Sequence, residues 1–150
     1  MEAANVVAVP AAMVFLSGGA LGAASFFAIA VMMALLAVGA AYWRAKHNWL
    51  VYRQPITPAV RLAARLKLPL LMATIAATTI AAAAWLLPGI APRRPDQIVA
   101  SIAALLAVLE YINYYHRQLQ HFDRAADFRR LLTGRGFRKS QLARDIERLA

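Results

Sequence analysis

Residues 68–88 read LPLLMATIAATTIAAAAWLLP and contain no charged side chain. A helix crosses the hydrocarbon core of a bilayer with about 20 apolar residues, and this stretch has that length. Pro69 falls in the first turn, where a proline costs little, and Pro88 with Gly89 ends the run. The stretch therefore predicts a membrane-spanning helix.

Two further apolar stretches flank this helix. Residues 3–43 contain no charged side chain, and residues 97–109 form a clean run that Glu110 interrupts before the chain continues to His116. We expect an all-α integral membrane protein with three transmembrane helices at about 14–43, 68–88 and 97–116. Residues 3–43 exceed one span, so a fold-back at Ser17–Gly22 would give four, although a single long helix is favoured.

The composition agrees with a membrane protein. Of the 150 residues, 61% are hydrophobic and only 16% are charged, and the mean hydropathy is +0.53. A soluble domain of this length needs more polar material to cover its surface. The chain has no cysteine, which excludes disulfides, thiolate metal sites and cysteine nucleophiles.

Basic residues set the expected orientation. The connecting segment 44–67, a basic elbow, carries six basic residues and no acid, and the tail 117–150 carries nine basic and four acidic residues. Within the elbow, Thr57 is expected to cap a short amphipathic helix that lies at the interface and leads into the second span. The positive-inside rule places the elbow and the tail in the cytoplasm, with the N-terminus outside. We therefore expect a transmembrane bundle over 1–116 in the inner (plasma) membrane and a basic cytoplasmic helical tail over 117–150.

Small residues at helical spacing predict close helix packing. Gly18 and Gly22 form a GxxxG spacing with Ser25 near the same face, and Thr74 and Thr78 lie four residues apart. Such residues let helix backbones approach, and threonines can hydrogen-bond across the contact. Packing within one bundle explains the pattern most simply, while a homo-oligomer or a larger membrane complex is the functional alternative.

The richest polar cluster lies at the end of the third span. Glu110 falls in the inner third of the predicted helix, where an ionised carboxylate needs a partner or water. We expect it to pair with a basic residue from a neighbouring span, such as Arg44, Lys46, Arg65 or Lys67. The ligand or ion-pair candidates are Glu110, Asn113, Tyr114, His116, Arg117, His121, Arg44 and Arg65.

Catalysis or metal binding at this cluster has weaker support. Glu110 and His116 are six residues apart, so they do not share a helix face, and His116 and His121 are also wrongly spaced. No catalytic residue, metal ligand or cofactor is therefore predicted, although a single histidine could ligate a haem. A proton or ion path past Glu110, lined by threonines, stays open.

The tail has two predicted helices. Residues 117–132 are expected to continue the third span, glycines at 134 and 136 stop that helix, and Ser140 caps a short helix carrying Leu142 and Ile146. The tail could lie on the membrane against anionic headgroups or dock a cytoplasmic partner. Nucleic acid is not an expected partner, because two short helices cannot build a DNA-reading domain.

The leading functional prediction is a non-enzymatic subunit or scaffold. It would pack through small-residue helix faces, form a homo-oligomer or join a larger membrane complex, and present its basic tail. The alternative is a small membrane enzyme or transporter with a ligand or proton site near Glu110.

Overall fold

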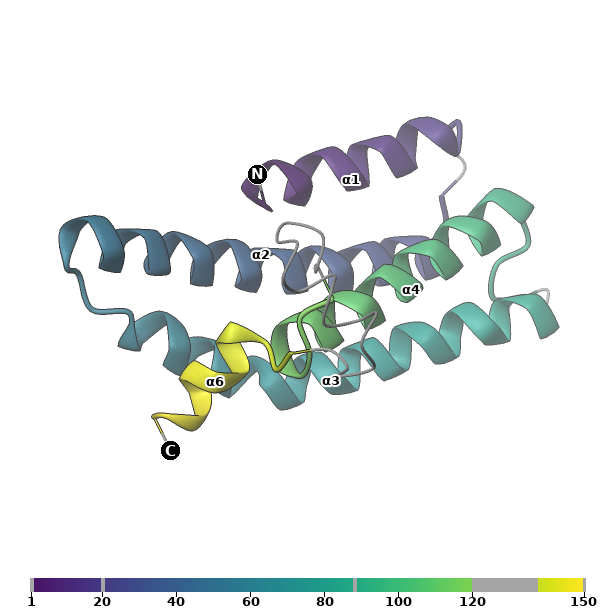
Figure 1. Ribbon diagram of the computed structural model, residues 1–150. Coiled ribbons are helices and arrows are strands. Elements are labelled where there is room, and N and C mark those ends of the chain that lie inside the picture. The colour runs from purple at the N-terminus through teal and green to yellow at the C-terminus, as the bar shows by residue number, and fades with distance from the viewer. Residues whose placement is uncertain (1, 20, 88, 120–137, 150) are drawn as a thin grey trace, which may run out of the picture.

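The computed structural model describes residues 2–19, 21–87, 89–119 and 138–149, and the elements within them are helices (Figure 1). Apart from one isolated antiparallel bridge between Arg117 and Lys139, these residues contain no strand pairing. The helices are α1 (Glu2–Leu16), α2 (Ala23–Tyr52), α3 (Thr57–Leu86), α4 (Arg94–Tyr115) and α6 (Gln141–Glu147).

Three of these helices are long and apolar enough to cross a membrane: α2, α3 and α4. This confirms the predicted all-α class and the number of candidate spans. Helix α1 is apolar but only 15 residues long. It covers about 22 Å at 1.5 Å per residue, less than the roughly 30 Å hydrocarbon core.

The expectation of a single helix at about 14–43 is wrong, because the chain turns between α1 and α2. Gly18 and Gly19 have φ of 60° and 76°, a left-handed conformation that glycine adopts without the steric cost that a Cβ atom brings. Gly18 and Gly22 therefore do not form a GxxxG helix face. The fold-back adds the short helix α1 and leaves the number of candidate spans at three.

The predicted elbow 44–67 is also mostly helical. Helices α2 and α3 have 30 residues each, and only residues 53–56 connect them. Each helix extends about 45 Å, which exceeds both the hydrocarbon core and the roughly 33 Å of the 22-residue α4. The α2–α3 hairpin therefore projects beyond the end of α4 (Figure 1). We call this end of the molecule the basic end, since the elbow's six basic residues lie on it.

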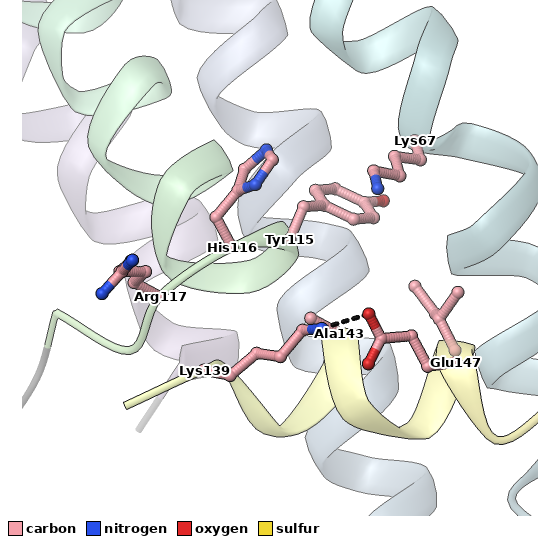
Figure 2. Close-up of a pocket in the computed structure, with 8 residues that line it drawn as sticks. Lys67, Tyr115, His116, Arg117, Lys139, Ala143 and Glu147 are labelled. Carbon is pink, nitrogen blue, oxygen red and sulfur yellow. Dashed lines mark hydrogen bonds and ion pairs between the residues drawn. The ribbon is translucent and has the colours of Figure 1, made fainter. Parts of the chain in front are cut away.

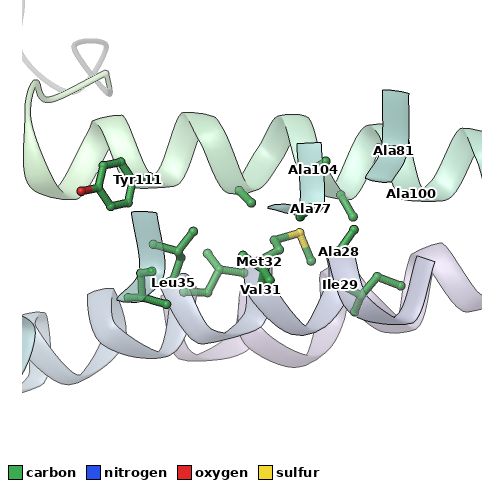
Figure 3. Packing of buried hydrophobic residues seen from close by; sticks show 14 of the residues in the cluster. Ala28, Ile29, Val31, Met32, Leu35, Ala77, Ala81, Ala100, Ala104 and Tyr111 are labelled. Atoms are coloured by element: carbon green, nitrogen blue, oxygen red, sulfur yellow. The ribbon is translucent and has the colours of Figure 1, made fainter. Parts of the chain in front are cut away.

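The bundle core is built from small side chains between larger ones. Met32 and Leu35 of α2 lie against the alanines Ala77 of α3 and Ala104 of α4 (Figure 3), and all four are buried. Alanines let the helix backbones approach, as expected for helices that pack without a strong hydrophobic drive in lipid. This part of the packing prediction agrees with the structure.

The threonines of α3 do not bond across the helix contact as predicted. The Thr74 hydroxyl donates to the Leu70 carbonyl at 2.7 Å, and that of Thr78 donates to the Thr74 carbonyl at 2.9 Å. Both bonds close within one turn of α3, so these hydroxyls are satisfied without a neighbouring helix.

Candidate functional site

Polar groups gather at the two ends of the bundle, and Asp96 organises the end opposite the basic end. Asp96 lies in the first turn of α4, but Arg93 is the N-cap of that helix. The Asp96 carboxylate instead accepts hydrogen bonds from the backbone N–H groups of Gly22 at 2.9 Å and Ser25 at 3.2 Å, and from the Ser25 hydroxyl. Asp96 is only 2% exposed.

This contact caps α2 from another helix. The first N–H groups of a helix lack partners within it and carry the positive end of the helix dipole, so a carboxylate there is stabilising. A Cβ added at Gly22 would collide with the Asp96 carboxylate. Sequence analysis missed this role, because an aspartate before an apolar run looks the same whether it caps its own helix or a distant one.

At the basic end, Asp145 fastens α6 to α2. Its carboxylate accepts a hydrogen bond from the Tyr42 hydroxyl at 2.7 Å and one from the Lys46 ammonium at 2.9 Å. Burial opposes ionisation of Asp145, but the hydrogen bonds from Lys46 and Tyr42 outweigh it, so the pKa of this carboxyl lies below its ordinary value. We call these three residues the Asp145 latch.

Backbone pairing brings the chain back to the end of α4. The Gln118 N–H donates to the Arg138 carbonyl at 2.9 Å, and the Ser140 N–H donates to the His116 carbonyl at 3.1 Å. The Ser140 hydroxyl bonds the Tyr114 carbonyl and accepts from the Ala143 N–H, which confirms the predicted cap of the C-terminal helix. The C-terminal segment is thus held at a fixed place on the bundle.

The predicted continuation of the third span into the tail is wrong at its start. Helix α4 ends at Tyr115, and residues 117–119 are not helical. The rest of the predicted helix, the glycines at 134 and 136 and the candidate His121 lie outside the described residues.

Among the described residues, Glu110 forms no ion pair with a basic side chain, and the expected partner Lys46 pairs with Asp145 instead. The side chains of Asn113 and Tyr114 interact with its carboxyl. The second carboxyl oxygen, Oε2, is buried and has no hydrogen-bond partner within the described part of the chain. The structure therefore joins three of the predicted residues at the polar end of α4.

The other candidates lie apart from Glu110. Arg44 and Arg65 are exposed on α2 and α3, and His116 and Arg117 are exposed just beyond α4. Within the described ranges, no three His, Asp or Glu residues are grouped as a metal site would require.

His116 and Arg117 belong instead to a cavity of about 520 Å³ that sequence analysis did not identify, here called the basic pocket. Its basic side chains are Lys67, Arg117 and Lys139, and Glu147, which ion-pairs with Lys139, is the acid in its wall (Figure 2). Tyr115 is held in the wall by a hydrogen bond from its hydroxyl to the Ala63 carbonyl at 2.9 Å. No pattern in the sequence links Lys67 to Lys139, because the fold alone joins them.

Comparison of the chain with family models, with curated proteins and with solved structures finds no match. At the end opposite the basic end, Asp96 connects α4 to the start of α2. The basic end combines the docked helix α6 with an open cavity.

Proposed function

We propose that the protein is a non-enzymatic subunit or scaffold of an assembly in the inner membrane, with its basic end and C-terminus in the cytoplasm. The Asp145 latch carries this proposal. It holds α6 against α2 through a carboxylate bonded to both Tyr42 and Lys46. Helix α6, fixed in this way, is a formed surface that a partner can bind without the entropic cost of ordering it.

The exposure of α3 also supports a partner within the membrane. Only 28% of its apolar window is buried inside the bundle, against 50% for α2. Exposed large side chains such as Leu68, Met72 and Ile75 lie along it. Lipid can cover such a face, but a helix of a partner or a second copy would bury it equally well.

The test is the mass of the particle released from its own membrane in polymer-bounded nanodiscs, measured by native mass spectrometry. We expect a mass above that of one chain. The variant Leu142→Asp should undock α6 and lower this mass, because Leu142 belongs to α6 and its side chain is only 2% exposed. The matched control Arg144→Gln changes an exposed residue of the same helix and should leave the mass unchanged. A wild-type particle containing one copy of the chain and no other protein would refute the proposal.

A second candidate function rests on Glu110. Its Oε2 atom is buried without a hydrogen-bond partner in the described part of the chain, and buried carboxyls in spanning helices are used as proton sites. This favours the alternative of a transporter or small membrane enzyme. Proton flux into liposomes containing the purified protein should then fall in Glu110→Gln, and equal flux in wild type, variant and empty liposomes would exclude it.

A further inference from the structure

We propose that the protein binds one anionic phospholipid at the basic end, with its phosphate in the basic pocket and an acyl chain in an adjoining groove between α3 and α4. The inference rests on the membrane placement in the proposed function, but it does not need a protein partner. It joins two cavities that share His116.

The basic pocket has the charge that a phosphate requires. Among the described residues that line it, three are cations, Lys67, Arg117 and Lys139, and one is a carboxylate, Glu147. The cations come from three segments of the chain, and the bridge between Arg117 and Lys139 fixes two of them relative to each other. A site assembled before the ligand arrives loses less conformational entropy on binding.

The depth of the pocket fits a lipid headgroup. From Lys67 to Leu86, α3 has 20 residues, or about 30 Å, which is the thickness of the hydrocarbon core. If Leu86 lies at one boundary of that core, Lys67 lies at the other. Basic pockets between spanning helices at this level are places where anionic headgroups bind.

The groove begins where the pocket ends. It is a largely apolar cavity of about 420 Å³ whose wall includes Leu71, Ile75 and Thr78 of α3 and Val108 and Ile112 of α4. Leu71 follows Lys67 by one helical turn, and His116 lines both cavities. The α3 wall from Leu71 to Thr79 covers about 12 Å, close to the roughly 15 Å of one leaflet.

Together, the basic pocket and the apolar groove favour an anionic phospholipid over a soluble anion. Inorganic phosphate could use Lys67 and Lys139 but would leave the groove empty. A neutral phospholipid could fill the groove but would gain little from three cations. A phospholipid with net negative charge, such as phosphatidylglycerol, satisfies both cavities at once.

The test measures lipid retention on the delipidated, full-length protein by native mass spectrometry, with phosphatidylglycerol and phosphatidylcholine added separately. Wild type should retain phosphatidylglycerol more strongly. Lys67→Gln should weaken its binding about fivefold, as expected for one basic residue at a headgroup, and leave phosphatidylcholine unchanged. Arg61→Gln is the matched control, because Arg61 is another exposed basic residue of α3 outside the pocket.

The groove has its own pair of variants. Thr78→Phe should obstruct the groove and weaken both lipids, whereas Ala82→Phe, on an exposed part of α3 outside the groove, should weaken neither. Helicity and melting temperature show whether each variant folds. Because Lys67 is exposed, Lys67→Gln tests the proposal even if Thr78→Phe does not fold.

Three outcomes would overturn the inference. The first is equal retention of the two lipids by wild type, and the second is an equal loss of phosphatidylglycerol binding in Lys67→Gln and Arg61→Gln. The third is a rise in melting temperature with inorganic phosphate as great as that with phosphatidylglycerol. The last outcome would assign the pocket to a soluble phosphate. A single-copy particle that retains phosphatidylglycerol would refute the scaffold proposal and leave this inference standing.

Discussion

At the scale of single residues, two glycines set how closely the helices approach. Gly22 leaves room for the Asp96 carboxylate, and Gly39 of α2 leaves room for the Tyr114 ring of α4. The sequence predicted a role for Gly22 only within a GxxxG helix face, which the structure does not form, and predicted no role for Gly39. The requirement for glycine at both positions comes from a side chain more than 70 residues away, which no local pattern contains.

Removing the Asp96 carboxylate should destabilise the bundle. Asp96→Ala leaves the N–H groups of Gly22 and Ser25 without their acceptor in a buried place, at a cost of about 2 kcal/mol. Asp96→Asn should cost less, because its amide oxygen can still accept. Unfolding in detergent micelles, followed by circular dichroism, measures both variants, and wild-type stability in Asp96→Ala would contradict the capping role.

Adding a methyl group at Gly39 should also destabilise the fold. Its Cβ would overlap the Tyr114 ring, and forcing extra volume into a packed contact costs about 1–3 kcal/mol. Combining Gly39→Ala with Tyr114→Ala should recover part of the loss, which a double-mutant cycle on the same unfolding data can detect. Gly89→Ala is the control, since open space surrounds Gly89. Additive losses in the double variant would show that the two residues do not meet.

At the scale of elements, the apolar cores of the three candidate spans could be predicted from the sequence, but the full extent of their helices could not. Charge-free runs identified α3 and α4 well, because lipid excludes charge from the hydrocarbon core. Beyond the core, the sequence predicted a short interfacial helix from Thr57, whereas in the structure that helix is the first part of α3 and α2 continues to Tyr52. Hydropathy reports the solvent around a residue and does not report its backbone conformation.

Only the part of the candidate site that lies within one helix could be predicted from the sequence. The sequence correctly brought Glu110, Asn113 and Tyr114 together, because residues three and four apart share a helix face. It did not find the partner of Lys46, since Asp145 follows it by 99 residues. The Tyr42 hydroxyl, which also bonds Asp145, lies 103 residues before it in the chain.

The docking of α6 should depend on pH through Asp145. Its pKa in the folded protein lies below the ordinary 3.8, so the docking energy is present above about pH 3.8 and is lost as pH falls through the lower, folded value. Spin labels on Gln54→Cys and Arg144→Cys, both at exposed positions of a cysteine-free chain, report the distance from α6 to the hairpin. The distance distribution should be narrow at neutral pH and broad in acid.

Asp145→Asn is the comparison for this experiment. It cannot ionise, so its distance distribution should not change with pH, and it should be broader than that of wild type at neutral pH because the ion pair to Lys46 is lost. A wild-type distribution that stays narrow in acid below the folded pKa would show that other contacts, such as buried Leu142, hold α6 without the carboxylate.

At the scale of the whole molecule, the two ends of the bundle have different tasks. At one end, Asp96 joins α4 to α2. At the other end, α6 docks on the projecting α2–α3 hairpin (Figure 1). Lys67 of this hairpin lines the basic pocket. The proposed scaffold role and the proposed lipid site both require these ends to lie on opposite sides of a membrane. That separation is the central claim.

Labelling of single cysteines with a membrane-impermeant maleimide tests this claim most directly, because the natural chain has no cysteine. Three exposed positions are used: Arg93→Cys at the Asp96 end, and Gln54→Cys and Arg144→Cys at the basic end. In intact cells Arg93→Cys should react from outside, whereas the other two should react only after the membrane is opened. Labelling of Arg93→Cys and Gln54→Cys from the same side would contradict the three-span arrangement and both proposals.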